Sequence, residues 1–230
     1  MKNNKTVLIT GSSKGLGEAL SLTFARNKYN VILHGRDATR LEKIKNQVLN
    51  EGVMCDVVTG NLLLDDTLAK LAELSNSRDL DILINNAAVY ARKPFDKTSA
   101  DEIRNIISVN LVAPMLLTRS IFPIFERKKE GLILNINSFA GKNPSDGESA
   151  YCASKHGLRG FAGSLQFDAN RAGVRVVDIY IGAMNTGMIE GRKDLDKCIM
   201  PSEAAAFIFH VSAEYKSMRI SEIDLLRRIY

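Results

Sequence analysis

The chain has 230 residues, 45% hydrophobic and 25% charged, with a net charge of +5. This composition is ordinary for a soluble globular protein and excludes a collagen-like or Pro/Gly-rich disordered chain, and three scattered cysteines argue against a disulfide framework or a metal site. Basic residues do not cluster as nucleic-acid binding requires, so we expect no nucleic-acid partner. Apolar runs are too short for a spanning helix or a signal peptide. We therefore expect a cytoplasmic protein without membrane partners.

Short apolar, β-branched runs alternate along the chain with longer segments of helical periodicity. Strands are predicted at 6–10, 30–34, 53–58, 80–84, 132–137, 174–180 and 220–225. Helices are predicted at 15–27, 38–50, 65–75, 99–127, 149–172 and 202–211, with Pro114 expected to kink the fourth. This alternation predicts one α/β domain over 1–230, a doubly wound parallel sheet (Rossmann-like) with helices on both faces. Ligands bind such sheets at the carboxyl ends of the strands, and residues 1–90 would form the cofactor-binding half.

A glycine-rich turn, Thr-Gly-Ser-Ser-Lys-Gly-Leu-Gly at 10–17, follows the first predicted strand. Glycines let the backbone approach a phosphate closely, and the next helix offers free amide hydrogens at its N-terminus. The spacing differs from the general dinucleotide fingerprint, and a purely structural turn is the alternative. The position of the turn directly after a buried strand favours nucleotide binding.

The end of the second predicted strand indicates which cofactor binds. A carboxylate there would accept from the ribose 2′-hydroxyl of NAD, whereas an arginine accommodates the 2′-phosphate of NADP. This chain has Gly35 and Arg36, and we interpret Asp37 as the N-cap of the next helix. Lys14 adds a second cation, and two cations fit a dianionic phosphate. The sequence predicts a preference for NADPH; the alternative is two solvated surface cations.

Tyr151 and Lys155 stand four residues apart near the start of the predicted helix 149–172, so they share one face. An unperturbed tyrosine has a pKa of about 10, and a nearby ammonium group favours the phenolate and lowers that pKa. The pair is therefore a candidate general acid/base, although a lone Tyr-x-x-x-Lys also arises by chance.

Taken in order, these motifs resemble the compact, single-domain branch of the short-chain dehydrogenase/reductase family over about four-fifths of the chain. Further matches are Asn-Asn-Ala-Ala at 85–88, Asn110, Ser138 thirteen residues before Tyr151, and the segment from Gly182 to Thr186. The resemblance implies an NADPH-dependent oxidoreductase that transfers a hydride between the nicotinamide and a ketone, aldehyde or alcohol.

The resemblance also implies a role for each matching residue. Ser138 would hydrogen-bond the substrate oxygen, and Tyr151 would exchange the proton with it. Lys155 would hold the nicotinamide ribose and keep Tyr151 acidic, while Asn110 would hold a water that links Lys155 to solvent. The implied cofactor contacts are Gly11, Ser13, Lys14, Gly15, Leu16, Gly17, Arg36, Asn61, Leu62, Asn86, Ala87, Ala88, Tyr151, Lys155, Gly182, Met184 and Thr186.

Three positions depart from the family pattern. Asn61 stands where an aspartate usually faces the adenine, and it keeps an accepting amide oxygen without the charge. Ala88 replaces a glycine, and Ile181 replaces the proline before Gly182. None of the three changes removes a catalytic group, but each bears on cofactor affinity.

The segment 187–212, together with Met184, resembles the part of the family that covers the substrate; Met188 and Ile189 lie within it, and ordinary loop packing is the alternative. No feature of the chain identifies the substrate. A non-catalytic NADPH-binding sensor or scaffold is the main alternative function. Sugar-nucleotide epimerases or dehydratases also use Tyr-x-x-x-Lys, but they resemble longer chains.

The family commonly pairs its two long helices, here 99–127 and 149–172, across two-fold axes. The resemblance therefore implies a homodimer or homotetramer, which is the usual symmetric solution for soluble homo-oligomers. Phe161, Leu165 and Phe167 would serve either that interface or the core.

Overall fold

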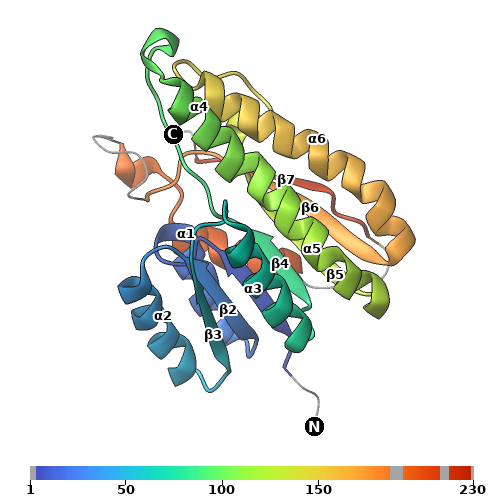
Figure 1. The fold of residues 1–230 in the computed structure, drawn as a ribbon. Helices are drawn as coiled ribbons and strands as arrows, with labels where there is room; N and C mark the ends of the chain where they lie inside the picture. Colours follow the sequence, from blue (N-terminus) through green and yellow to red (C-terminus); the bar gives the residue numbers. More distant parts are fainter. Residues whose placement is uncertain (1–3, 187–193, 213–217, 229–230) are drawn as a thin grey trace.

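The computed structural model describes residues 4–186, 194–212 and 218–228 (Figure 1). Among them is one seven-stranded sheet in the order β3-β2-β1-β4-β5-β6-β7, with every neighbouring pair parallel. The strands are β1 (Thr6–Thr10), β2 (Asn30–Gly35), β3 (Cys55–Thr59), β4 (Ile82–Asn85), β5 (Gly131–Ser138), β6 (Val174–Ile181) and β7 (Glu222–Leu225). The doubly wound parallel sheet expected from the sequence is confirmed.

Helices cover both faces of the sheet (Figure 1). They are α1 (Gly15–Arg26), α2 (Ala38–Asn50), α3 (Asp65–Ser77), α4 (Ala100–Ile107), α5 (Ala113–Lys128), α6 (Ser149–Ala172) and α7 (Pro201–Ser212). The apolar core on one face joins α1, α2 and α7, and the core on the other joins α3, α5 and α6. The strand order reverses between β1 and β4, which is where an open α/β sheet leaves a crevice for ligands.

The central strand β1 shows why the strands appear in the sequence as continuous runs of apolar residues. All five of its residues are buried. Val7 and Ile9 point into the core with α1, whereas Leu8 points into the opposite core. Side chains alternate between the two faces of a strand, so a strand covered on both faces is apolar at both sets of positions.

The single helix predicted at 99–127 is interrupted by a π-helical turn, Ser108–Val112, between α4 and α5. In this turn the Ala113 N–H donates to the Ser108 carbonyl, five residues back. The irregularity thus lies one turn before the kink expected at Pro114. Pro114 lacks the N–H that would bond the Asn110 carbonyl four residues back, which lies inside this turn.

This helical stretch also corrects the expectation about membrane spans. By length and composition alone, Ala100–Lys128 is apolar enough to cross a membrane, whereas the residue pattern predicted no such helix. However, Leu117, Ile121 and Phe125 are fully buried and pack in the core that α5 shares with α3 and α6. This packing against the sheet accounts for part of the apolar character, since 39% of the most apolar window of the stretch is buried.

Candidate active site

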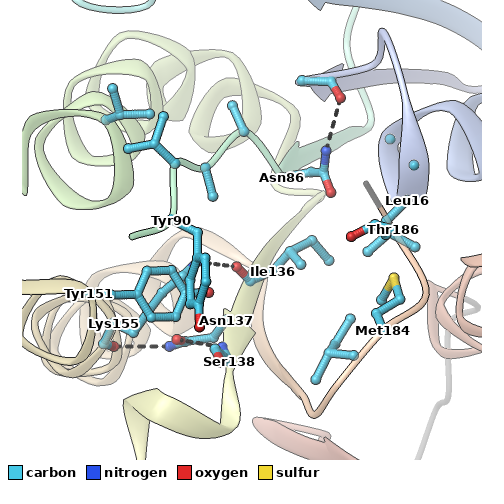
Figure 2. Close-up of a pocket in the computed structure, with 18 of the residues that line it drawn as sticks. Leu16, Asn86, Tyr90, Ile136, Asn137, Ser138, Tyr151, Lys155, Met184 and Thr186 are labelled. Atoms are coloured by element: carbon cyan, nitrogen blue, oxygen red, sulfur yellow. Dashed lines mark hydrogen bonds between the residues drawn. The ribbon is translucent and has the colours of Figure 1, made fainter. Parts of the chain in front are cut away.

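A cleft of about 1270 Å³ opens at the carboxyl ends of the strands. It is lined by every residue that the sequence analysis assigned to the site except Asn110. Figure 2 shows Tyr151, Lys155 and Ser138 together on one side of the cleft, with Asn86 and Thr186 across from them. The fold therefore gathers residues from the whole length of the chain at one edge of the sheet.

Close packing explains two glycines of the turn after β1. Gly11 has a φ of +69°, and a Cβ there would lie 2.9 Å from the Ala87 Cα. A Cβ on Gly17 would lie 2.2 Å from the Gly11 carbonyl oxygen. A side chain at either position would collide with backbone, so both must be glycine for the turn to lie against the 85–88 segment. The turn therefore brings the N-terminus of α1 directly to the cleft.

Thr10 and Asn86 join the ends of β1 and β4 at the switch point. The Thr10 hydroxyl accepts from the backbone N–H groups of Asn86 and Ala87, both at 3.0 Å. The Asn86 side chain donates to the Thr10 carbonyl at 2.8 Å (Figure 2). These bonds satisfy backbone groups that the sheet leaves unpaired and hold the 85–88 segment beside the glycine turn.

Three cations line the cleft beyond the end of β2. Lys14 and Arg36 were predicted, whereas Arg40, in the first turn of α2, was missed. Asp37 caps α2 as expected, accepting from the Arg40 N–H at 3.0 Å, and its carboxylate pairs with the Arg40 guanidinium at 3.2 Å. The Asp37 carboxylate is therefore held by α2 and by Arg40. Its negative charge is partly neutralised there, which suits a site that receives an anion.

Two further side chains of this region are committed to the protein. The Asn61 amide oxygen accepts from the Leu63 N–H at 3.1 Å, which uses one of its two lone pairs and fixes the side chain beside its own loop. His34 is buried at the end of β2, and burial lowers the pKa of its imidazole to about 4. His34 is therefore neutral at physiological pH and adds no charge to the cleft.

Tyr151, Ser138 and Lys155 come from α6 and the end of β5. Ser138 lines the cleft beside Tyr151 and acts to lower the pKa of its hydroxyl, and Tyr151 is 8% exposed. The Lys155 ammonium donates to the Ile136 carbonyl at 2.8 Å and lies 5.8 Å from the centre of the Tyr151 ring (Figure 2). The i, i+4 spacing on α6 thus sets both side chains against the end of β5.

The electrostatics of this group differ from the expectation. Burial raises the pKa of Tyr151 to about 12, and Ser138 opposes that rise only in part. Burial also lowers the pKa of Lys155 to about 8. The predicted lowering of the Tyr151 pKa by Lys155 is not met in this structure, because desolvation dominates and the ammonium binds the Ile136 carbonyl.

Asn110 lies in the π-helical turn and does not line the cleft. Its side chain accepts from the Val89 N–H and donates to the Val89 carbonyl, both at 2.8 Å, and also donates to the Ser154 hydroxyl at 3.2 Å. The side chain therefore clamps the segment after β4 to α6. Its expected role as holder of a water beside Lys155 stays a prediction.

Two residues that line the cleft, Tyr90 and Glu148, were not predicted from the sequence. The Tyr90 hydroxyl donates to the Glu148 carboxylate at 2.6 Å, and the Tyr90 ring packs edge-on against Tyr151 with centroids 5.0 Å apart. The only available signal was the position of Tyr90, directly after the 85–88 motif and Val89. Met184 lines the cleft as predicted, whereas Met188 and Ile189 lie outside the described residues.

A family model described as short chain dehydrogenase matches residues 5–196. Dehydrogenase/reductase SDR family member 7 of Mus musculus is 31% identical over 191 residues, which cover 80% of this chain and 56% of that protein. The chain thus spans little more than half of that relative's length. A sepiapterin reductase of Chlorobaculum tepidum is 29% identical to this chain. The match covers 95% of this chain and 94% of the reductase.

Among solved structures, a metagenomic short-chain oxidoreductase in complex with NADP superposes with a TM-score of 0.86. It is 28% identical, and the match covers 98% of each chain. The sheet and the helices around it therefore correspond over almost the entire length of the two proteins.

Proposed function

The chain belongs to the short-chain dehydrogenase family of NAD(P)-dependent oxidoreductases, and we propose that it is an NADPH-dependent reductase of ketones or aldehydes that also works in reverse as an alcohol dehydrogenase. The observation that carries the proposal is the gathering of Tyr151, Ser138 and Lys155 at one end of the cleft, with the Lys155 ammonium 5.8 Å from the centre of the Tyr151 ring (Figure 2). Lys14 and Arg36 line the other end. We propose that the substrate is a small molecule and that the reaction takes place in the cytoplasm.

The residues present fit NADPH. The turn after β1 opens onto the N-terminus of α1, whose free amide hydrogens suit a pyrophosphate. Arg36 and Lys14 suit a 2′-phosphate, and a NADP-bound structure with this fold supports the same assignment. Bound NADPH would supply the hydride. Asn86, Ala87, Gly182 and Thr186 line the space between the glycine turn and Tyr151, where the nicotinamide ribose would lie.

The chain's own residues would then manage the proton and the substrate oxygen. Ser138 would hydrogen-bond the carbonyl oxygen, and Tyr151 would donate its phenolic proton as negative charge develops there. A tyrosine with a raised pKa is protonated at neutral pH, as a proton donor must be. The Lys155 ammonium would hold the ribose and stabilise the resulting phenolate.

A non-catalytic NADPH-binding sensor is the alternative function. The loss of NADPH absorbance with a panel of ketones, aldehydes and diketones separates the two. A reductase consumes NADPH with at least one carbonyl. A sensor binds NADPH without consuming it, and in that case the reductase proposal is wrong.

The cofactor preference gives a second test. Removing a charged hydrogen-bonded partner costs about 1.5–3 kcal/mol, so Arg36→Ala should weaken NADPH binding about 10- to 150-fold while NADH binding barely changes. Arg104→Ala is the matched control, because Arg104 pairs with Asp101 on the surface and does not line the cleft. Titration calorimetry measures all six affinities, those of the wild type and of both variants for NADPH and for NADH. Equal affinity of the wild type for NADPH and NADH contradicts the proposed preference.

We also propose a homodimer or homotetramer. A groove of about 470 Å³ between α5 and α6 is lined by both apolar and charged side chains. The apolar ones are Met115, Phe122, Pro123, Phe161 and Leu165, and the polar ones are Thr118, Arg119, Glu126, Asp168 and Arg171. Phe161 and Leu165 thus reach the outer face of α6, although Leu165 also packs against the core. Two-fold pairing of such a face is the common route to a soluble dimer.

Light scattering at micromolar protein tests the assembly. Met115→Glu places a charge in the groove and should shift the mass toward the monomer, because an unpaired buried charge is costly. Phe95→Glu is the control, because Phe95 is 65% exposed and lies outside the groove. A wild-type mass of 25.4 kDa, that of one chain, would refute the proposal.

A further inference from the structure

A buried polar cluster lies directly beneath the candidate site. Asp178, in the middle of β6, is 2% exposed. Its carboxylate accepts from Asn135 Nδ2 at 2.9 Å, from the Tyr180 hydroxyl at 3.1 Å and from Asn137 Nδ2 at 3.4 Å. Among the described residues it forms no ion pair with a lysine or arginine. Burying a carboxylate without a paired cation lowers the stability of the fold even when the carboxylate is hydrogen-bonded.

Asn137 connects this carboxylate to two residues of the site. Its side-chain oxygen accepts from the Ser138 N–H at 2.8 Å. Its amide nitrogen donates to the Lys155 carbonyl at 3.2 Å and to Asp178 (Figure 2 shows the contacts with Ser138 and Lys155). Asn137 is 3% exposed, so water cannot readily replace these bonds. One side chain thus ties the end of β5 to the first turns of α6.

The charged groups around Asp178 come from three elements. Asp178 acts on Lys155 of α6 as a favourable charge that raises the lysine pKa, and Glu222 on β7 raises the pKa of Asp178 from beyond Tyr180. Lys142 and Arg159 pair with that Glu222 carboxylate at 3.0 and 3.2 Å, which reduces its influence. Lys155 is thus the cation whose charge Asp178 balances inside the protein.

We propose that Asp178 and Asn137 are positioning residues for the reaction: Asn137 fixes Ser138 relative to Lys155, and Asp178 anchors Asn137 and supplies the negative charge that balances the Lys155 ammonium. The role rests on the proposed function, because Ser138 and Lys155 act in it. Both residues work through others: Asn137 lines the cleft, but its side chain is bound to Ser138, Lys155 and Asp178, and Asp178 does not line the cleft.

The titrations agree with this arrangement. Burial raises the pKa of Asp178 to about 6, and burial lowers the pKa of Lys155 to about 8 while Asp178 acts to raise it. Between these two values both groups are charged. A negative charge favours an ammonium, so removing the Asp178 charge must move the loss of the Lys155 proton to lower pH.

Asp178→Asn tests the charge. Lysine labelled with ¹³C at Cε is followed by NMR against pH in the cofactor-free protein, and the resonance absent from Lys155→Met identifies Lys155. In the wild type its midpoint should lie near 8, and in Asp178→Asn at lower pH. The alkaline fall of carbonyl reduction should move in the same direction. Tyr180→Phe, which removes one hydrogen bond to Asp178 but keeps the carboxylate, should move the lysine midpoint much less. An unchanged lysine midpoint in Asp178→Asn overturns the balancing role.

Asn137→Ser tests the tether and remains decisive if Asp178→Asn does not fold. A misplacement of about 1 Å can cost about 10²-fold in rate, so kcat should fall about 10-fold or more while NADPH affinity stays near the wild-type value. A wild-type kcat in Asn137→Ser overturns the tethering role. If the wild type itself reduces no carbonyl, the proposed function fails, and the NMR titration still decides whether Asp178 balances Lys155.

Discussion

Replacing Tyr151 with phenylalanine is expected to lower the turnover of carbonyl reduction by about 10²- to 10⁴-fold, the usual contribution of general acid–base catalysis. The change removes one oxygen and keeps the ring, which packs edge-on against Tyr90. Fold and NADPH affinity should therefore be retained, because the contacts proposed for the cofactor lie in the glycine turn and at Arg36 and Lys155. Turnover on a carbonyl found in the screen and NADPH affinity by titration check the two halves of the prediction.

Tyr90→Phe is the matched control for Tyr151→Phe. It also removes one phenolic oxygen at the cleft, but that oxygen is bound to the Glu148 carboxylate and not to Ser138. We expect turnover to fall less than about tenfold, because this oxygen takes no part in the proposed proton transfer. If Tyr151→Phe retains nearly wild-type turnover, the proton comes from another group and the proposed mechanism is wrong.

The pH dependence of the wild type follows from the raised pKa of Tyr151. With a pKa of about 12, the phenol is protonated through the neutral range, so it remains a donor for carbonyl reduction. Alcohol oxidation needs the phenolate, so its rate should rise as the pH rises. Rates in both directions between neutral and alkaline pH measure this. An oxidation rate that falls steadily with rising pH would show that Tyr151 is not the base.

Local patterns predicted most of the fold because this sheet is covered on both faces. Continuous apolar runs such as the one in β1 had no other simple explanation, and the boundaries of α2 and α6 were predicted to the residue. The interruption at Ser108–Val112 was displaced from Pro114 because the missing amide hydrogen acts on the turn before the proline.

The chemistry of the site was predicted less completely, since it depends on tertiary burial. Spacing places Tyr151 and Lys155 on one face of a helix, but it does not show that burial raises one pKa and lowers the other. Polar side chains in otherwise apolar strands were a usable signal. Asn135 and Asn137 on β5 and Asp178 on β6 alternate with buried aliphatic residues, and each takes part in the cluster beneath the site.

Replacing Lys155 with methionine is expected to lower both turnover and cofactor affinity. Methionine is similar in length and apolar, so it fits a side chain that is 3% exposed. NADPH affinity should fall about 10- to 150-fold for the loss of one charged hydrogen bond, and turnover should fall at least about 10²-fold because the phenolate loses its stabilising charge. Turnover on the screened carbonyl and NADPH affinity by titration measure both effects. This joint loss distinguishes the variant from Tyr151→Phe, which should spare affinity.

A catalytic role of Lys155 is distinguished from a structural one by the function of the folded variant. Removing the buried ammonium leaves the Asp178 charge unbalanced and the Ile136 carbonyl without its donor, so the melting temperature should fall whichever role Lys155 has, and only the binding and turnover of the folded protein separate the two roles. Lys142→Met is the control: Lys142 pairs with Glu222 and Asp224 at the surface end of the same cluster, so its loss should affect stability more than turnover. If Lys155→Met melts far below the wild type while its folded fraction binds NADPH and turns over normally, Lys155 serves the fold and not the reaction.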